Sequence, residues 1–217
     1  GVDGQTVNWG VLQAIGVAGL VTLVFIRTSL FVRLGAGLAI LFLYQFLLDR
    51  YWLDAVLSSA HNGLPGSLAW AAMLILSTVM ADGFHRAKSG LRNLVASSFL
   101  VLILGLTFTL VFPISKNRCS ASYVMVSLGL SGLIFSALHI LVIRLDWKFS
   151  WLVMWGKNPL LLYVLHLLLL GIIVLPGVPA WNHNAPAWLT IIQAGFLFVS
   201  LSWIAWLLEK KKLYLKI

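Results

Sequence analysis

Apolar residues along this chain form long runs that contain very few charged residues. A helix that crosses a membrane needs about 20 mostly apolar residues. Seven stretches qualify: residues 9–26, 30–48, 65–83, 94–112, 121–143, 159–175 and 187–208. None of them alternates apolar and polar positions as the strands of a membrane β-barrel do. The pattern predicts an all-α integral membrane protein, a polytopic helical bundle with about seven transmembrane helices.

The stretch between the second and third runs, residues 51–64, is too polar to span and is predicted to lie at the membrane interface. No linker, low-complexity tract or convincing internal repeat divides the chain. Residues 1–217 are therefore expected to form a single transmembrane domain.

The composition excludes most other classes of protein. Hydrophobic residues make up 61% of the chain and charged residues 10%, whereas soluble domains average about 45–50% and about 25%. A soluble enzyme, a disordered chain and a disulfide scaffold are all excluded on this ground. The one cysteine, Cys119, allows neither an internal disulfide nor a cysteine-based metal site, and no metal cofactor is expected.

The net charge of +9 is distributed unevenly between the two sides that seven helices would define. Twelve of the 15 Lys and Arg residues fall on one side, and the other side holds Arg50, Lys116 and Arg118. The positive-inside rule places the larger group in the cytoplasm, which predicts an outside N-terminus and a cytoplasmic C-terminus. Since this rule accounts for the basic excess, membrane lipid is the expected partner and nucleic acid is not.

The start of the sixth run is the first candidate site. Asn158 suits the N-cap of a helix that begins at Pro159, and Lys157 adds a positive charge to that helix end. Asn158, Tyr163 and His166 share one helix face with Leu162. A histidine inside a membrane span is a default candidate for function, although a helix cap with a hydrogen-bonded histidine explains the pattern equally well.

The loop before the fifth run is the second candidate. Lys116 and Asn117 lie on the predicted outer side, with Tyr123 shortly after them. Cations kept outside could bind a polar or anionic group, but a solvated turn that caps the next helix through Ser120 or Ser122 is somewhat favoured by spacing alone.

Other polar residues favour structural roles. Thr78, Asp82 and His85 share a helix face, and Asp82 can pair with Arg86 four residues later. His61 and His183 lie in outer loops, where they could be solvated or could line the mouth of a pocket. The motifs of soluble hydrolases, nucleotide-binding proteins and zinc proteases are missing from the sequence. Spacing alone therefore leaves enzyme and transporter open.

Several short motifs follow one another along the chain: Gly-Val-Leu-Gln at 10–13, Phe-Pro-x-x-Lys-Asn at 112–117, Ser-Tyr-Val at 122–124, Gly-x-Asn at 156–158, Tyr163, His166 and the basic run 210–217. In this order they resemble the heparan-α-glucosaminide N-acetyltransferase family. The resemblance implies a transmembrane acyltransferase that moves acetyl from cytosolic acetyl-CoA to an extracytoplasmic sugar or amino sugar.

The resemblance also assigns roles to both candidate sites. It implies that Lys157, Asn158, Tyr163 and His166 bind acetyl-CoA, and that the other candidates, Lys116, Asn117 and Tyr123, bind the sugar. The family's catalytic histidine lies ahead of the matching region, so none of the present residues is assigned as catalytic. The chain is expected to be the C-terminal portion of a longer acyltransferase domain that is inactive alone.

Two other functions stay open. One is a transporter or permease for a small polar or anionic solute, and the other is a non-catalytic scaffold. The absence of Asn-x-Ser/Thr sequons and the short loops favour a bacterial inner membrane. Whether the chain forms a homo-oligomer is also left open.

Overall fold

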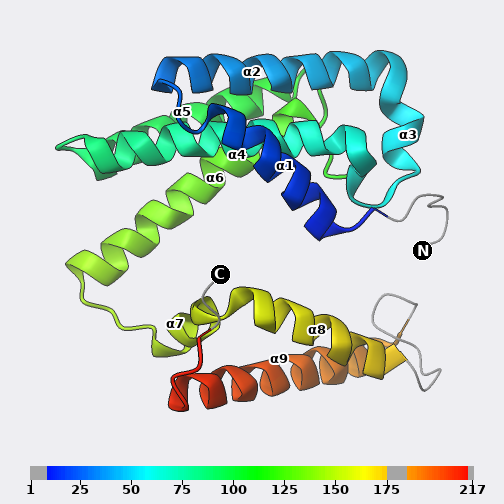
Figure 1. The fold of residues 1–217 in the computed structure, drawn as a ribbon, viewed down its shortest axis with the longest axis vertical. Helices are drawn as coiled ribbons and strands as arrows, with labels where there is room; N and C mark the ends of the chain where they lie inside the picture. Colours follow the sequence, from blue (N-terminus) through cyan, green and yellow to red (C-terminus); the bar gives the residue numbers. More distant parts are fainter. Residues whose placement is uncertain (1–8, 175–184, 215–217) are drawn as a thin grey trace. The chain divides into compact units, whose positions relative to one another are not determined.

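The computed structural model describes residues 9–174 and 185–214, and the regular elements in these ranges are all helices (Figure 1). The prediction of an all-α protein is confirmed. The chain divides into two compact units, Gly1–Leu145 and Asp146–Ile217, and each is described here by itself. The single transmembrane domain expected from the sequence stays a prediction. His183 and Lys216 lie outside the described residues.

The first unit is a bundle of antiparallel helices. Its elements are α1 (Val11–Phe25), α2 (Leu30–Leu47), the π-helical turn η1 (Leu48–Trp52), α3 (Leu53–Leu57), the short 3-10 turn η2 (Ala60–Asn62), α4 (Gly63–Arg86), α5 (Gly90–Phe108), α6 (Ala121–His139) and a closing π-helical turn, η3 (Ile140–Arg144). The helix α4 is central, because α1, α2 and α5 all pack against it (Figure 1). The most extensive contact in the unit is between α5 and α6.

The second unit contains α7 (Ser150–Lys157), α8 (Pro159–Val174) and α9 (Ala187–Lys210). Both α7 and α8 pack against α9. The axes of α7 and α8 differ by 85°, and Asn158 lies at the break. Proline at the first position of α8 explains the break, since it lacks the N–H that a continuous helix would need.

The predicted number of transmembrane helices is confirmed only in part. Five helices of the described chain are long and apolar enough to cross a membrane, and there are six if α7 and α8 form one bent span. The predicted seven spans included α1, which has 15 residues and is shorter than the about 20 residues that a span needs. The interfacial stretch 51–64 is mostly helical and belongs to the ends of two long helices, Leu30–Leu57 and Ala60–Arg86.

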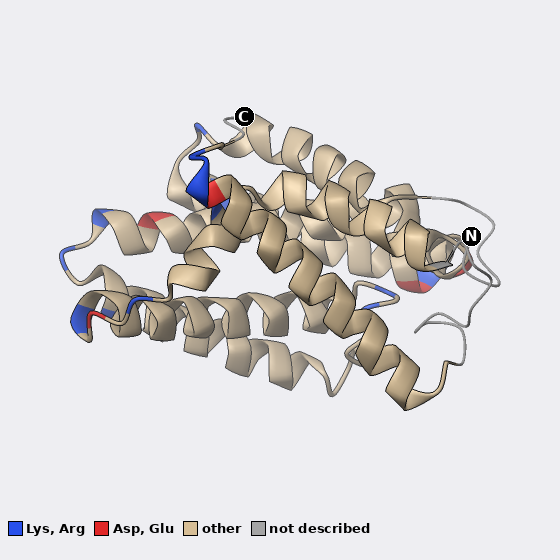
Figure 2. Cartoon of the chain, turned by 90° about the horizontal axis from the view of Figure 1, so that it is seen from below, with Lys and Arg blue, Asp and Glu red and all other residues tan. Residues whose placement is uncertain are grey.

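The distribution of apolar side chains is that of a protein surrounded by lipid. Large apolar residues such as Phe31, Leu110 and Ile191 are at least 70% exposed, while the small residues Ala69 and Ala72 are fully buried. Lys, Arg, Asp and Glu lie at helix ends and in connecting segments (Figure 2). Together with the span-length helices, this arrangement indicates a membrane-embedded protein.

Glycines allow α5 and α6 to approach closely. A Cβ added to Gly129 of α6 would lie 2.7 Å from the backbone N and Cα of Leu102 on α5. A Cβ added to Gly105 of α5 would lie 2.7 Å from the backbone N of Val126 on α6. Small residues at such positions are a common way to pack membrane helices, because lipid supplies no hydrophobic force that would hold them together.

The buried Cys119 provides a chemical probe of folding. Its side chain has no exposed surface, and burial raises the pKa of the thiol from 9.0 to about 12. Since the thiolate is the reactive form, we expect native protein at pH 7 to resist maleimide and protein in SDS to react fully, as measured by the mass shift of the intact chain.

A neighbouring position supplies the control for this labelling. Arg118 is exposed. The double variant Arg118→Cys/Cys119→Ala should therefore react with maleimide in the native state. Rapid labelling of native wild-type protein would show that the loop around Cys119 opens readily.

Candidate functional site

A polar pocket lies at the end of the first unit where the turn before α4 meets the loop between α5 and α6. Its cavity has a volume of about 300 Å³, and its walls include His61, Asn62, Trp70, Lys116 and Asn117. It therefore brings together chain segments that are more than 50 residues apart. We call this cavity the acceptor pocket, after the role that the resemblance implies for Lys116 and Asn117.

The His61 side of the acceptor pocket is a strained turn. His61, Asn62 and Gly63 all have positive φ angles, of 50°, 70° and 62°. Histidine, asparagine and glycine tolerate this region better than most residues. A Cβ at Gly63 would lie 2.9 Å from the side chain of Ser59, so the turn also needs a small residue there. Backbone strain of this kind is concentrated at functional sites, and here it presents an imidazole at the cavity wall.

Asn62 joins the two sides of the pocket. Its side chain is 5% exposed, and its Nδ2 donates a hydrogen bond to the backbone carbonyl of Lys116 at 3.2 Å. A buried amide with a partner across the pocket stabilises the relative position of the two loops.

Two side chains of α2 form hydrogen bonds to the loop that contains Lys116. The Tyr44 hydroxyl donates to the backbone carbonyl of Arg118 at 2.7 Å. Gln45 accepts from the backbone N–H of Ala121 at 2.8 Å and donates to Asp49 at 2.9 Å. Both Tyr44 and Gln45 are buried, so the loop is anchored in the core of the unit.

Ser120 caps α6, as predicted for this turn. Its Oγ accepts from the backbone N–H of Tyr123 and from that of Ser115, at 3.3 and 3.2 Å. The capping interpretation of the loop is thus confirmed. It is compatible with a binding role, since the side chains of Lys116 and Asn117 still line the cavity.

Tyr123, the third residue predicted to bind the sugar, contacts the pocket through a neighbour. Its ring packs edge-on against Trp70 with 6.3 Å between ring centroids, and Trp70 lines the cavity. Among the described residues, the buried indole N–H of Trp70 has no hydrogen-bond acceptor.

The residues predicted to bind acetyl-CoA lie around the break between α7 and α8. Lys157 forms an ion pair with Glu209 of α9, with 2.6 Å between Nζ and Oε1. The Tyr214 hydroxyl donates to the other carboxylate oxygen of Glu209 at 3.2 Å. The positive charge of Lys157 is therefore paired, and its expected role at the phosphates of CoA stays a prediction.

Three more residues with polar side chains lie near this break: Asn158 at the break itself, and Tyr163 and His166 on α8. Asn158 is buried, and its Nδ2 donates to the backbone carbonyl of Leu213 at 3.0 Å. The backbone carbonyl of Asn158 accepts a hydrogen bond from the backbone N–H of Leu162 at 3.0 Å, as that of an N-cap residue does. Tyr163 and His166 are half-buried neighbours with ring centroids 5.9 Å apart. A small cavity of about 300 Å³ is lined by Asn158, Leu213 and Tyr214, among others.

An ion-pair cluster occupies the other end of the first unit. Asp82 pairs with Arg86 at 3.2 Å, as predicted, and also with Arg33 of α2. Arg33 is 4% exposed and donates to the Thr78 hydroxyl at 3.1 Å. Arg33 is one of the twelve Lys and Arg residues counted on the more positive predicted side. It lies one turn inside α2, where the partly exposed carboxylate of Asp82 stabilises it.

Sequence reasoning missed the contribution of Asn62 and Trp70 to the acceptor pocket and named His61 only as a residue that could shape a pocket mouth. The Asn-Gly pair at 62–63 is a turn signal that could have marked this wall. No local pattern could have joined it to Lys116.

The chain has no match among family models, curated proteins or solved structures.

Proposed function

We propose that the protein is a transmembrane acyltransferase that transfers acetyl from acetyl-CoA to a sugar or amino sugar bound in the acceptor pocket. The observation that carries this proposal is the meeting of His61, Asn62, Trp70, Lys116 and Asn117 around one cavity. Such a mixture of hydrogen-bonding groups and one aromatic ring suits a ligand with several hydroxyl groups and an apolar face. The resemblance noted in the sequence supports the same reaction.

The chemistry of the proposed reaction is a single acyl transfer. A hydroxyl or amino group of the acceptor attacks the acetyl carbonyl carbon, the carbon–sulfur bond breaks, and CoA leaves as a thiol that carries the proton lost by the acceptor. Lys116 and Asn117 hydrogen-bond the acceptor and orient it, because correct orientation of reactants lowers the barrier. The resemblance assigns none of the present residues as the catalytic histidine.

The donor is proposed to bind near Asn158, Tyr163 and His166. We propose that His166 on α8 hydrogen-bonds the thioester or the pantetheine arm. Lys157 joins this site only if its pair with Glu209 opens. The proposed orientation has seven spans, with the acceptor pocket outside and the C-terminus in the cytoplasm of a bacterial inner membrane, in accord with the charge distribution.

We expect the double substitution Lys116→Ala/Asn117→Ala to reduce acetyl transfer to glucosamine at least about fivefold, because lost hydrogen bonds to a bound substrate cost about 0.5–1.5 kcal/mol each. The assay is incorporation of labelled acetyl-CoA into glucosamine by membranes that contain the full-length protein. Asn158→Ala and His166→Ala should also lower the rate, through weaker binding of the donor.

Arg118→Ala is the matched control, because Arg118 is an exposed cation in the same loop whose backbone carbonyl, and not its side chain, meets Tyr44. Equal rates for wild type and the Lys116/Asn117 variant, at equal expression, would remove the acceptor pocket from the reaction.

A transporter is the second candidate, and the break between α7 and α8 favours it. Transporters bind small solutes at discontinuous helices of this kind, and the two helix axes here differ by 85°. Uptake of a sugar into vesicles without acetyl-CoA, lost on Asn158→Ala, would favour transport over acyl transfer.

A further inference from the structure

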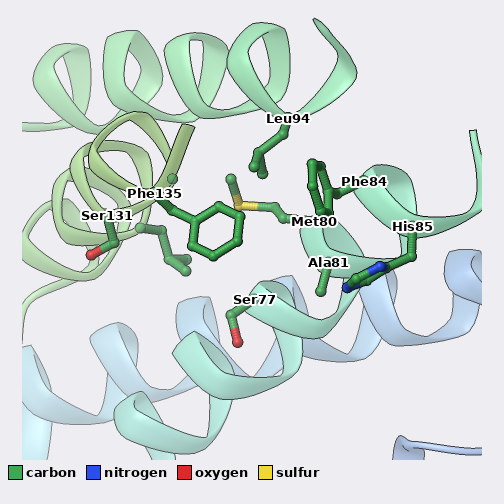
Figure 3. Close-up of a pocket in the computed structure, with 10 residues that line it drawn as sticks. Ser77, Met80, Ala81, Phe84, His85, Leu94, Ser131 and Phe135 are labelled. Atoms are coloured by element: carbon green, nitrogen blue, oxygen red, sulfur yellow. The ribbon is translucent and has the colours of Figure 1, made fainter. Parts of the chain in front are cut away.

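A second and larger cavity lies between α4, α5 and α6. Its volume is about 430 Å³. Met80 and Phe84 of α4, Leu94 of α5 and Phe135 of α6 surround it, and their side chains point toward one another (Figure 3). Apart from His85 and two serines, the lining is apolar. The name acyl groove is used for this cavity below.

The acyl groove opens on the exposed surface of the helical bundle. Phe135 is 51% exposed, and Ala81 on the opposite wall is also exposed. Both residues belong to helices long and apolar enough to cross a membrane. An apolar recess on such helices is filled most favourably by hydrocarbon, because water would find few polar partners there.

An aromatic cluster gives the groove a rigid wall. The ring of Phe84 packs edge-on against Phe135 and His139, with centroid distances of 5.7 and 5.2 Å, and against His85 at 5.0 Å. Edge-to-face contacts of this kind hold rings in defined orientations. The wall is therefore formed before any ligand binds, which lowers the entropy lost on binding.

The rim of the groove carries a cluster of positive charge. Three exposed cations, Arg86, Lys88 and Arg92, lie on or beside the short turn between α4 and α5. His85 and Leu94, which line the groove, are within two residues of Arg86 and Arg92. Asp82 is shared between Arg33 and Arg86. Lys88 and Arg92 have no ion-pair partner in the described part of the chain.

We propose that the acyl groove binds one acyl chain of an anionic phospholipid, whose phosphate lies against Lys88 and Arg92. The apolar lining accounts for the chain, and the charge of the rim is complementary to the phosphodiester. This lipid site is separate from the acceptor pocket and does not depend on the proposed function.

The test is lipid binding by the purified protein in detergent, measured by native mass spectrometry with phosphatidylglycerol, phosphatidylcholine and glycerol 3-phosphate. We expect phosphatidylglycerol to bind at least about tenfold more tightly than phosphatidylcholine, because basic residues near an anionic lipid surface each contribute substantially to affinity. Glycerol 3-phosphate alone should neither bind at the same concentration nor displace the lipid.

Two variants test separately how the cations of the rim and the apolar cavity contribute to lipid binding. Lys88→Gln/Arg92→Gln should remove the preference for phosphatidylglycerol, and Ala81→Trp should weaken both lipids by filling the groove. The matched controls are Lys211→Gln/Lys212→Gln, which removes the same charge from an exposed segment after α9, and Ala39→Trp, which adds the same side chain to an exposed position on α2.

Three outcomes would overturn the proposal: equal binding of the two lipids, an equal loss of affinity in the Lys211/Lys212 control, or displacement of the lipid by glycerol 3-phosphate. A diazirine on the acyl chain of phosphatidylglycerol gives an independent readout on wild-type protein. Cross-links on α4 and α6 around Ala81 and Phe135 support the groove, and cross-links only elsewhere refute it, even if Ala81→Trp does not fold.

Discussion

Replacing Gly129 with alanine is expected to lower the free energy of unfolding by about 1–3 kcal/mol, the usual cost of forcing an extra group into a well-packed contact. The new Cβ would lie 2.7 Å from the backbone of Leu102. Backbone atoms cannot move aside as the end of a flexible side chain can, so α5 and α6 must separate. Loss of helical circular dichroism on heating or on titration with SDS would measure the effect.

Gly19→Ala on α1 is the matched control, because its added Cβ would have no atom within 4 Å. The same substitution there should leave stability unchanged or raise it by up to about 1 kcal/mol, since alanine is the better helix former. If both variants were equally stable, the close contact between α5 and α6 would not be important for stability.

Arg33→Met is expected to destabilise the first unit at least as much as Gly129→Ala. The substitution keeps much of the buried aliphatic volume but removes the guanidinium from Asp82 and Thr78. Asp82 then keeps only Arg86, whose side chain is 77% exposed, and removing the buried partner from an ion pair is costly. The same unfolding assays measure the loss.

The second substitution Asp82→Leu tests this explanation. If the cost of Arg33→Met comes from a carboxylate that has lost its buried partner, the double variant should be more stable than Arg33→Met alone. Arg86→Met is the matched control, because Arg86 touches the same carboxylate but its side chain is 77% exposed, and exposed pairs contribute little. Additive losses in the double variant would show that Arg33 acts through packing alone.

The polar side chains at the two ends of the first unit show how far sequence reasoning reached. The pair of Asp82 with Arg86 was predictable, because residues four apart on a helix are neighbours. The Ser120 cap was predictable for the same local reason. The burial of Arg33 was not predicted, because an arginine near a helix start is usually a solvated, orienting charge in membrane proteins. Its burial depends on a carboxylate 49 residues later in the chain.

The candidate sites show the same limit. Lys116 and Asn117 were chosen from an outer loop without knowledge of their neighbours, and the structure adds His61, Asn62 and Trp70 to the same cavity. Lys157 was chosen for its charge, and the structure pairs that charge with Glu209. In both cases the residue type was visible, but the partner that sets its chemistry was 50 or so residues away.

The sequence by itself determined that the protein is helical and membrane-embedded, because a run of apolar residues is a local property and lipid requires each segment to satisfy its own backbone hydrogen bonds. Only the tertiary structure decided which polar groups meet. The hydrogen bond between Asn62 and Lys116, the pair between Arg33 and Asp82 and the pair between Lys157 and Glu209 all join separate helices or loops. Such contacts depend on how helices pack, and packing is set by shape at positions such as Gly105 and Gly129, which hydropathy does not record.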